Sequence, residues 1–112
     1  MYIQRIRLYR GEDKNFLMTL QDGNGKRFSA DRCLVKMQAR SPIDGTLLLE
    51  LSTANGQIQT LGSVLLITIN AEDTARAVWK NANFDVLIET PQGRRMYVLR
   101  GVVTLDANIT MD

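Results

Sequence analysis

Apolar and polar residues alternate along most of the chain, and a period of two residues is typical of strands that bury one face. Between residues 33 and 40, for example, Val35, Met37 and Ala39 alternate with Lys36 and Gln38. The same pattern predicts strands over residues 2–10, 16–20, 33–40, 46–52, 64–69, 84–90, 94–100 and 102–105, with weaker candidates at residues 26–29 and around Ile58. Gly101 separates the last two main segments, and we interpret it as a bulge that interrupts one long strand.

The alternation stops between residues 70 and 83, where the sequence predicts a short helical corner. Asn70 is a favourable N-cap residue, and Asp73 stands at the third helical position, as in a weak capping box. Glu72 adds negative charge where the helix dipole favours it. Such a corner carries the chain from one sheet to the other in antiparallel β-sandwiches.

Turn-forming residues separate the predicted strands. The runs DGNG at residues 22–25 and NG at 55–56 supply residues that tolerate positive φ, while SPIDG at 41–45 and PQG at 91–93 combine proline with glycine. Seven or eight short strands with one short helix predict an all-β fold, namely an immunoglobulin-like antiparallel β-sandwich with one short helical corner. No repeat or linker divides the chain, so residues 1–112 form a single predicted domain.

Composition adds little to this interpretation. Aromatic residues make up 6% of the 112 residues, so Leu, Ile, Val and Met are expected to build the core. The formal net charge of +2 is too small to indicate an electrostatic partner. Cys33 is the only cysteine and excludes an internal disulfide. The sequence shows no signal peptide and no segment that would span a bilayer, which predicts a protein made in the cytoplasm with no membrane partner.

Catalytic chemistry finds little support in the sequence. The chain contains no histidine, which excludes Ser-His-Asp and Cys-His mechanisms and removes the commonest metal ligand. The 12 acidic residues are scattered over turns, a helix start and strand surfaces. Cys33 alternates in phase with Val35 and Met37, so we interpret it as an inert buried thiol. The chain is therefore expected to be non-enzymatic, without a cofactor or a metal.

Several residues are candidates for contacts with a partner. Arg5, Arg7 and Arg10 on the first predicted strand, together with Arg94, Arg95 and Arg100 on the last, form one basic patch if these strands are neighbours. Few aromatic side chains accompany them, which favours a solvated or protein-binding face over a nucleic-acid site. The candidate interface residues are Arg5, Arg7, Leu48, Leu66, Trp79, Arg95 and Tyr97.

The apolar members of this set allow more than one interpretation. Leu48 and Leu66 stand on strand faces that otherwise look polar, so their exposure would create an apolar patch of the kind found at protein interfaces. Trp79 follows the helical corner, where it either plugs the end of the sandwich, the favoured interpretation, or anchors a partner.

The order of these turn and strand motifs resembles a family of small phage and prophage proteins encoded among virion structural genes, often near tail or baseplate components. The resemblance rests on RGEDKNF at residues 10–16, DGNG at 22–25, VKMQAR at 35–40, LELS at 49–52, NGQI at 55–58, LLI at 65–67, AEDTA at 71–75, FDV at 84–86 and RGVVT at 100–104. Two positions depart from the family pattern. Residues 30–33 replace an expected Asp-Leu-Thr-Gly turn, and Phe84 replaces a tyrosine and its corner hydrogen bond.

The resemblance implies a structural protein of a phage particle, in the tail or baseplate, that is present in the virion and in the host cytoplasm before assembly. Its expected partners are other virion proteins and further copies of itself in a symmetric arrangement. The loops at residues 41–45, 53–56 and 91–93 are candidate contacts. Two alternatives stay open: a head-decoration or head-completion protein, and a module that binds host-surface carbohydrate.

Overall fold

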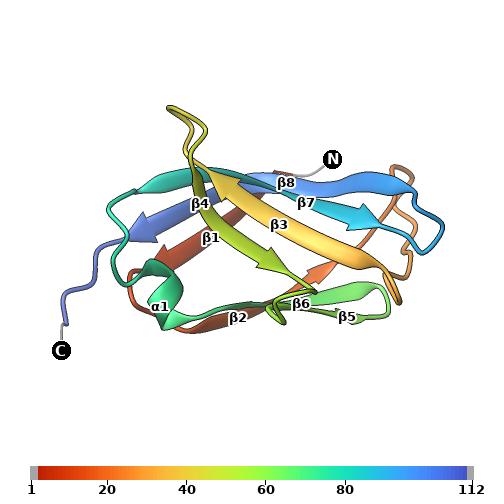
Figure 1. Cartoon of the computed structure of the whole chain (residues 1–112), viewed down its shortest axis with the longest axis horizontal. Helices are drawn as coiled ribbons and strands as arrows, with labels where there is room; N and C mark the ends of the chain where they lie inside the picture. Colours follow the sequence, from red (N-terminus) through yellow and green to blue (C-terminus); the bar gives the residue numbers. More distant parts are fainter. Residues whose placement is uncertain (1–2, 111–112) are drawn as a thin grey trace.

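The computed structural model describes residues 3–110, which form two facing β-sheets joined at one end by a short helix (Figure 1). Because the alternating segments bury one side of each strand, the two layers enclose a single core. The elements are β1 (Ile3–Tyr9), β2 (Lys14–Thr19), β3 (Leu34–Arg40), β4 (Leu47–Ser52), β5 (Ile58–Leu61), β6 (Val64–Ile69), α1 (Ala71–Thr74), β7 (Asn81–Glu89) and β8 (Arg95–Asp106).

The strand order is that of an immunoglobulin-like sandwich, as the sequence predicts. One sheet has the order β1-β8-β7-β3-β4 and the other the order β2-β6-β5. Neighbouring strands are antiparallel except β1 and β8, which run parallel with Ile3 opposite Arg100 and Tyr9 opposite Asp106. The first and last strands are therefore neighbours, which was the condition for the basic patch.

The predicted helical corner is also confirmed, and it carries the chain from β6 in the three-stranded sheet to β7 in the five-stranded sheet. The Asn70 backbone N–H donates to Asp73 Oδ2 at 2.8 Å, and the Ala71 N–H donates to Asp13 Oδ1 at 2.6 Å. The buried Thr74 accepts a further hydrogen bond from the Gly11 N–H through Oγ1 at 3.0 Å. These bonds tie the helix to the turn between β1 and β2.

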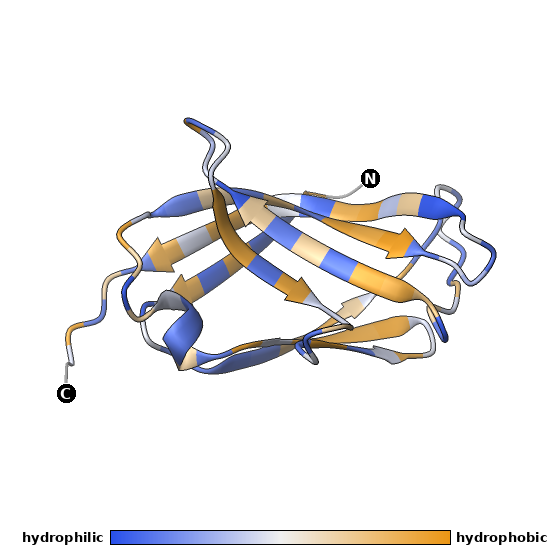
Figure 2. Cartoon of the chain, viewed as in Figure 1, coloured by the Kyte–Doolittle hydropathy of each residue, from blue (hydrophilic) through white to orange (hydrophobic). Residues whose placement is uncertain are grey.

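The core lies between the sheets and is made of the residues that the alternation places inward. Figure 2 shows the alternation of apolar and polar residues along β3. Aliphatic side chains dominate, and the largest fully buried ones are Leu8, Leu20, Met37, Leu51, Ile58, Leu65, Ile67, Ile69, Ile88, Val35, Val86 and Val103. The predicted aliphatic and methionine core is therefore confirmed.

A bulge in β4 corrects the predicted orientation of Leu48. Ala39 pairs with Leu49 but the next residue, Arg40, pairs with Leu47, so Leu48 is an extra residue in the ladder. As a result Leu48 is half-buried against the core, whereas Leu47 is 42% exposed. Leu48 therefore does not stand on a water-facing surface.

The predictions for residues 26–29 and for Gly101 are wrong. Residues 26–29 form no strand, and only an isolated bridge joins Gln21 to Arg27. Strand β8 continues through Gly101, and its register shift lies earlier, where Val86 pairs with Leu99 and Leu87 pairs with Tyr97.

Gly101 is required for close packing instead of a bulge. A Cβ atom built there would overlap the backbone carbonyl of Gln4 and lie 2.8 Å from Phe84 Cε1. The absence of a side chain therefore lets β1 approach β8 over the buried Phe84 ring, which occupies the position of the tyrosine expected from the phage family.

The turn before β3 forms although its sequence departs from the family pattern. The Cys33 N–H donates to the Ala30 carbonyl at 3.0 Å, and Arg32 adopts a left-handed backbone with φ of 65°. Asp31 Oδ1 also accepts a hydrogen bond from the Gly62 N–H at 3.0 Å. A left-handed conformation costs free energy in a residue other than glycine, so these hydrogen bonds hold the turn in a mildly strained conformation.

Candidate interaction surfaces

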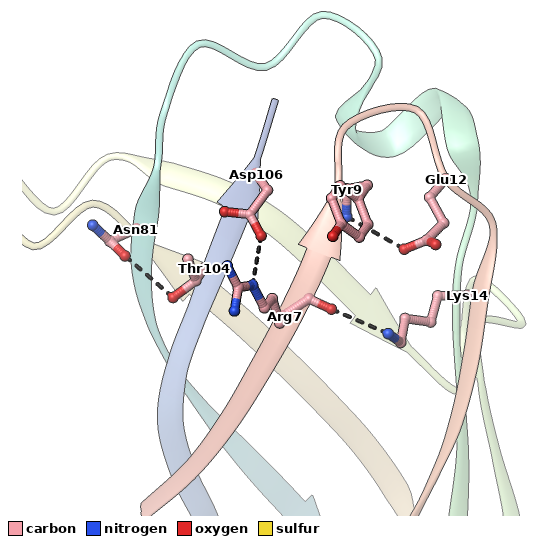
Figure 3. A network of polar contacts seen from close by, with 7 residues as sticks. All are labelled: Arg7, Tyr9, Glu12, Lys14, Asn81, Thr104 and Asp106. Carbon is pink, nitrogen blue, oxygen red and sulfur yellow. Dashed lines mark hydrogen bonds and ion pairs between the residues drawn. The ribbon is translucent and has the colours of Figure 1, made fainter. Parts of the chain in front are cut away.

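Arg7 belongs to a polar network at the end of the sandwich where β1 and β8 finish (Figure 3). Its Nε lies 2.5 Å from Asp106 Oδ2, and Lys14 Nζ donates to the Arg7 carbonyl at 3.1 Å. The hydrogen bond from the Arg7 guanidinium to Asp106, together with that carboxylate's charge, raises the pKa of Arg7. Arg7 is therefore exposed, as an interface residue would be, but its charge is already paired with Asp106 of its own chain.

The predicted single basic patch does not form. Arg5 and Arg7 lie on the outer face of β1, and the register places Arg100 on the same face beside Ile3. Strand β1 pairs only with the Arg100–Asp106 part of β8, whereas Arg95 lies at the far end of β8, opposite Glu89. Because β1 does not extend along that part of β8, Arg94 and Arg95 are separated from the other arginines.

Tyr97 lines a hollow on the outer face of the five-stranded sheet, which we call the polar hollow although Phe84 and Leu99 also line it. Its side chain is 60% exposed, and it lines a cavity of about 620 Å³ with Asn83, Asp85 and Arg100. Gln38 and Arg40 line the other side, where Gln38 Nε2 donates to Glu50 at 2.6 Å and Arg40 Nη2 donates to Gln38 Oε1 at 3.0 Å. The hollow thus presents amide, carboxylate, guanidinium and phenol groups.

Leu66 belongs to an apolar patch on the outer face of the three-stranded sheet. It is directly opposite Leu17, which is 65% exposed, and directly opposite side chains of this kind touch across a ladder. Val64 continues the same face of β6 and pairs with Leu61, which is 54% exposed. We call Leu17, Leu61, Val64 and Leu66 the outer apolar patch.

Sequence reasoning found Leu66 but missed the other three members of this patch. A signal was present, because Leu17 falls between the inward residues Phe16 and Met18 and so breaks the polar side of its strand. The patch forms only when β2 and β5 pair with β6, and β2 and β6 are about 50 residues apart in the chain.

Trp79 lies in the connection between α1 and β7, half-buried and packed against the core. This position agrees with the interpretation that it plugs the end of the sandwich. Its neighbour Val78 is 93% exposed, so the same connection also offers an apolar side chain to solvent.

The loop between β3 and β4 projects beyond the sandwich (Figure 1). Ile43 near its tip is 94% exposed. The exposed Asp44 braces the loop, because its Oδ1 accepts a hydrogen bond from the Thr46 N–H at 3.0 Å, and this hydrogen bond lowers the pKa of Asp44. The loop is therefore a hydrogen-bonded projection with an apolar tip.

Groups with catalytic potential are dispersed over residues 3–110. No three side chains of cysteine or acidic residues in this range gather as metal ligands. Cys33 is half-buried, whereas the sequence predicts a buried thiol. Desolvation raises the pKa of this thiol, and the charge of Asp31 raises it further. Within the same range no helix has the length and apolarity needed to cross a bilayer.

No family model and no curated protein matches the chain. Among solved structures, it is similar to a strand-swapped dimer of the extracellular domain of mouse leukocyte-associated immunoglobulin-like receptor 1, with 9% identity, a TM-score of 0.46, and coverage of 96% of this chain and 85% of that one. It is also similar to extracellular domains 3–5 of Drosophila OTK, with 13% identity, a TM-score of 0.37, and coverage of 92% and 33%.

Proposed function

We propose that this chain is a non-enzymatic structural protein of a phage particle, placed in the tail or baseplate, that acts through contacts with other virion proteins and with copies of itself. The phage context comes from the sequence resemblance. The structural observation that carries this contact role is the outer apolar patch, whose Leu17 and Leu61 are 65% and 54% exposed on a three-stranded sheet.

Physical chemistry explains why such a patch favours a contact role. Each apolar side chain left in water forgoes roughly 1.5–3 kcal/mol of burial free energy, and a partner that covers several of them recovers it. A rigid sheet also loses little conformational entropy on binding. The projecting loop with Ile43 at its tip offers a second contact of the same kind.

Electron microscopy of the intact particle tests the proposal. We expect density for the sandwich in the tail or baseplate, in several symmetric copies, with the outer apolar patch covered by a neighbour. Density on the capsid would instead identify a head-decoration or head-completion protein. Absence of the chain from purified particles would contradict a structural role.

The polar hollow beside Tyr97 favours one second candidate, a module that binds host-surface carbohydrate. An exposed aromatic ring flanked by amide and charged groups suits a sugar, because the ring packs on C–H groups while the polar side chains bind hydroxyls. Glycan-array binding that Tyr97→Ala abolishes without loss of folding would support this role. The matched substitution Tyr9→Ala, at another exposed tyrosine in the same sheet, provides the control.

A further inference from the structure

The five-stranded sheet ends in two strands that each have one side without a neighbouring strand. Strand β4 ends the sheet on one side and β1 on the other. Unpaired N–H and C=O groups along such an edge are a template on which a strand of another molecule can add. The hydrogen bonds at these two edges therefore decide whether a second chain can extend the sheet.

The free edge of β4 is formed by the backbone groups of Glu50 and Ser52. The Thr53 N–H donates to the Val35 carbonyl at 3.0 Å, so Thr53 faces β3. Backbone groups alternate between the two sides of a strand, and those of Glu50 and Ser52 therefore face away from β3. A strand added at this edge would use the Glu50 carbonyl and the Ser52 N–H.

The side chain of Asn55 already occupies both of these groups. Its Nδ2 donates to the Glu50 carbonyl at 3.2 Å, and its Oδ1 accepts the Ser52 N–H at 3.1 Å. A carboxamide has the same donor and acceptor as a peptide group, so Asn55 takes the place of a peptide group in an added strand. Two further hydrogen bonds hold it there, from the Gln57 N–H to its Oδ1 at 3.0 Å and from its own N–H to Ser52 Oγ at 3.1 Å.

The opposite edge of the sheet is capped in the same way (Figure 3). The Arg10 N–H donates to a carbonyl of β8, so the backbone groups of Arg7 and Tyr9 face away from β8. Lys14 Nζ donates to the Arg7 carbonyl at 3.1 Å, and Glu12 Oε1 accepts the Tyr9 N–H at 3.3 Å. At both edges, side chains therefore occupy a C=O group and the N–H group two residues later.

We propose that Asn55 closes β4 to strand addition and so prevents two copies of the chain from pairing edge to edge. In an antiparallel pair of β4 strands related by a two-fold axis, Glu50 of one copy can lie opposite Ser52 of the other, where their outward backbone groups bond one another. No like charges are directly opposed in this register, so the closure depends on Asn55. The inference concerns the purified chain and is independent of the proposed function.

Sedimentation velocity over a range of concentrations, combined with amide hydrogen exchange, tests the inference with Asn55→Ala. This variant should associate at least about tenfold more tightly than the parent chain, because the freed groups of each copy become available to the other. Exchange of the Ser52 amide in Asn55→Ala should be faster than in the parent at low concentration and should slow as concentration rises. In the parent chain, exchange at Ser52 should not depend on concentration.

Two further variants separate an opened edge from a general loss of stability. Asn24→Ala makes the same chemical change in the exposed turn after β2 and should associate no more than the parent. Asn55→Asp also loses the donor to the Glu50 carbonyl, but it leaves a negative charge at the edge that repels a second copy. It should therefore associate no more than the parent either.

An Asn55→Ala chain that is folded and associates no more tightly than the parent overturns the inference. Association of Asn55→Asp to the same extent, or association that leaves exchange at Ser52 unchanged, also overturns it.

The parent chain provides a test that needs no variant. Its Ser52 amide should exchange at least about tenfold more slowly than the Glu50 amide on the same edge, because Asn55 accepts only the first of these two N–H groups. Equal exchange at the two positions contradicts the cap even if Asn55→Ala fails to fold.

Discussion

At the scale of single residues, close packing explains positions that the sequence pattern could not. Glycine is often needed in a strand for its backbone freedom. Gly101 is needed because it has no side chain, which leaves room for the Gln4 carbonyl and the Phe84 ring. The sequence gives no sign of this, because Gln4 is almost 100 residues away and joins Gly101 only when β1 pairs with β8. A glycine inside a strand therefore indicates either a bulge or a close approach, and only the partner strand decides.

Gly101→Ala is expected to destabilise the fold by about 3 kcal/mol, because the added methyl group forces β1 away from β8. Chemical denaturation of the variant and the parent chain measures the change. Gly23→Ala is the matched control, since a Cβ atom there has no neighbour within 4 Å, and its effect should stay within about 1 kcal/mol. Equal stability of the two variants would contradict the close approach.

Cys33 should react slowly with alkylating reagents at neutral pH. Desolvation and the charge of Asp31 raise its pKa, and only the thiolate is nucleophilic. The pH midpoint of the alkylation rate should therefore be higher in the folded chain than in urea. Since the folded-state pKa is the raised one, any stability linked to this thiol is present below the unfolded pKa and is lost as pH rises through the folded pKa. An alkylation midpoint in the folded chain that is equal to or below that of the unfolded chain would refute the raised pKa.

At the scale of elements, the sequence predicted strands well because burial of one face imposes a period of two on each segment. The helical corner was equally predictable, since Asn70 and Asp73 carry a local capping signal. The bulge at Leu48 was not predictable, because it depends on how β4 pairs with β3 and not on β4 alone. The strand predicted at residues 26–29 does not form for a similar reason. A segment becomes a strand only when a neighbouring strand pairs with it, and here only one isolated bridge forms.

The corner depends on Asp73, whose carboxylate accepts the Asn70 N–H and the Gln57 Nε2, both at 2.8 Å. Asp73→Ala should lower the free energy of unfolding by about 1–2 kcal/mol, because it leaves these donors without their partner. Glu72→Ala is the control, since this exposed neighbour on the same helix makes no such bond. Thermal and urea denaturation of both variants provide the measurement, and an equal loss from Glu72→Ala would exclude a specific cap.

At the scale of the whole molecule, the candidate surfaces combine residues from distant parts of the sequence. The outer apolar patch needs β6 between β2 and β5, and the polar hollow needs β7 between β8 and β3. The sequence therefore predicted individual members such as Leu66 and Tyr97 but not the surfaces to which they belong. The prediction that the six arginines form one patch was also wrong, because neither strand's sequence shows how far β1 extends along β8.

A lysine in the outer apolar patch should prevent assembly without unfolding the sandwich. Leu61 is 54% exposed at the end of β5, so Leu61→Lys should change the free energy of unfolding by no more than about 0.5 kcal/mol. Val78→Lys, at a 93% exposed side chain outside the patch, is the matched control.

Quantitative mass spectrometry of purified phage particles carrying the parent chain, Leu61→Lys or Val78→Lys tests the central claim most directly. The account predicts that the parent chain and Val78→Lys are incorporated at a fixed copy number and that Leu61→Lys is folded but largely lost from the particles. Particles that lack the parent chain, or that incorporate Leu61→Lys as fully as the parent, would contradict it.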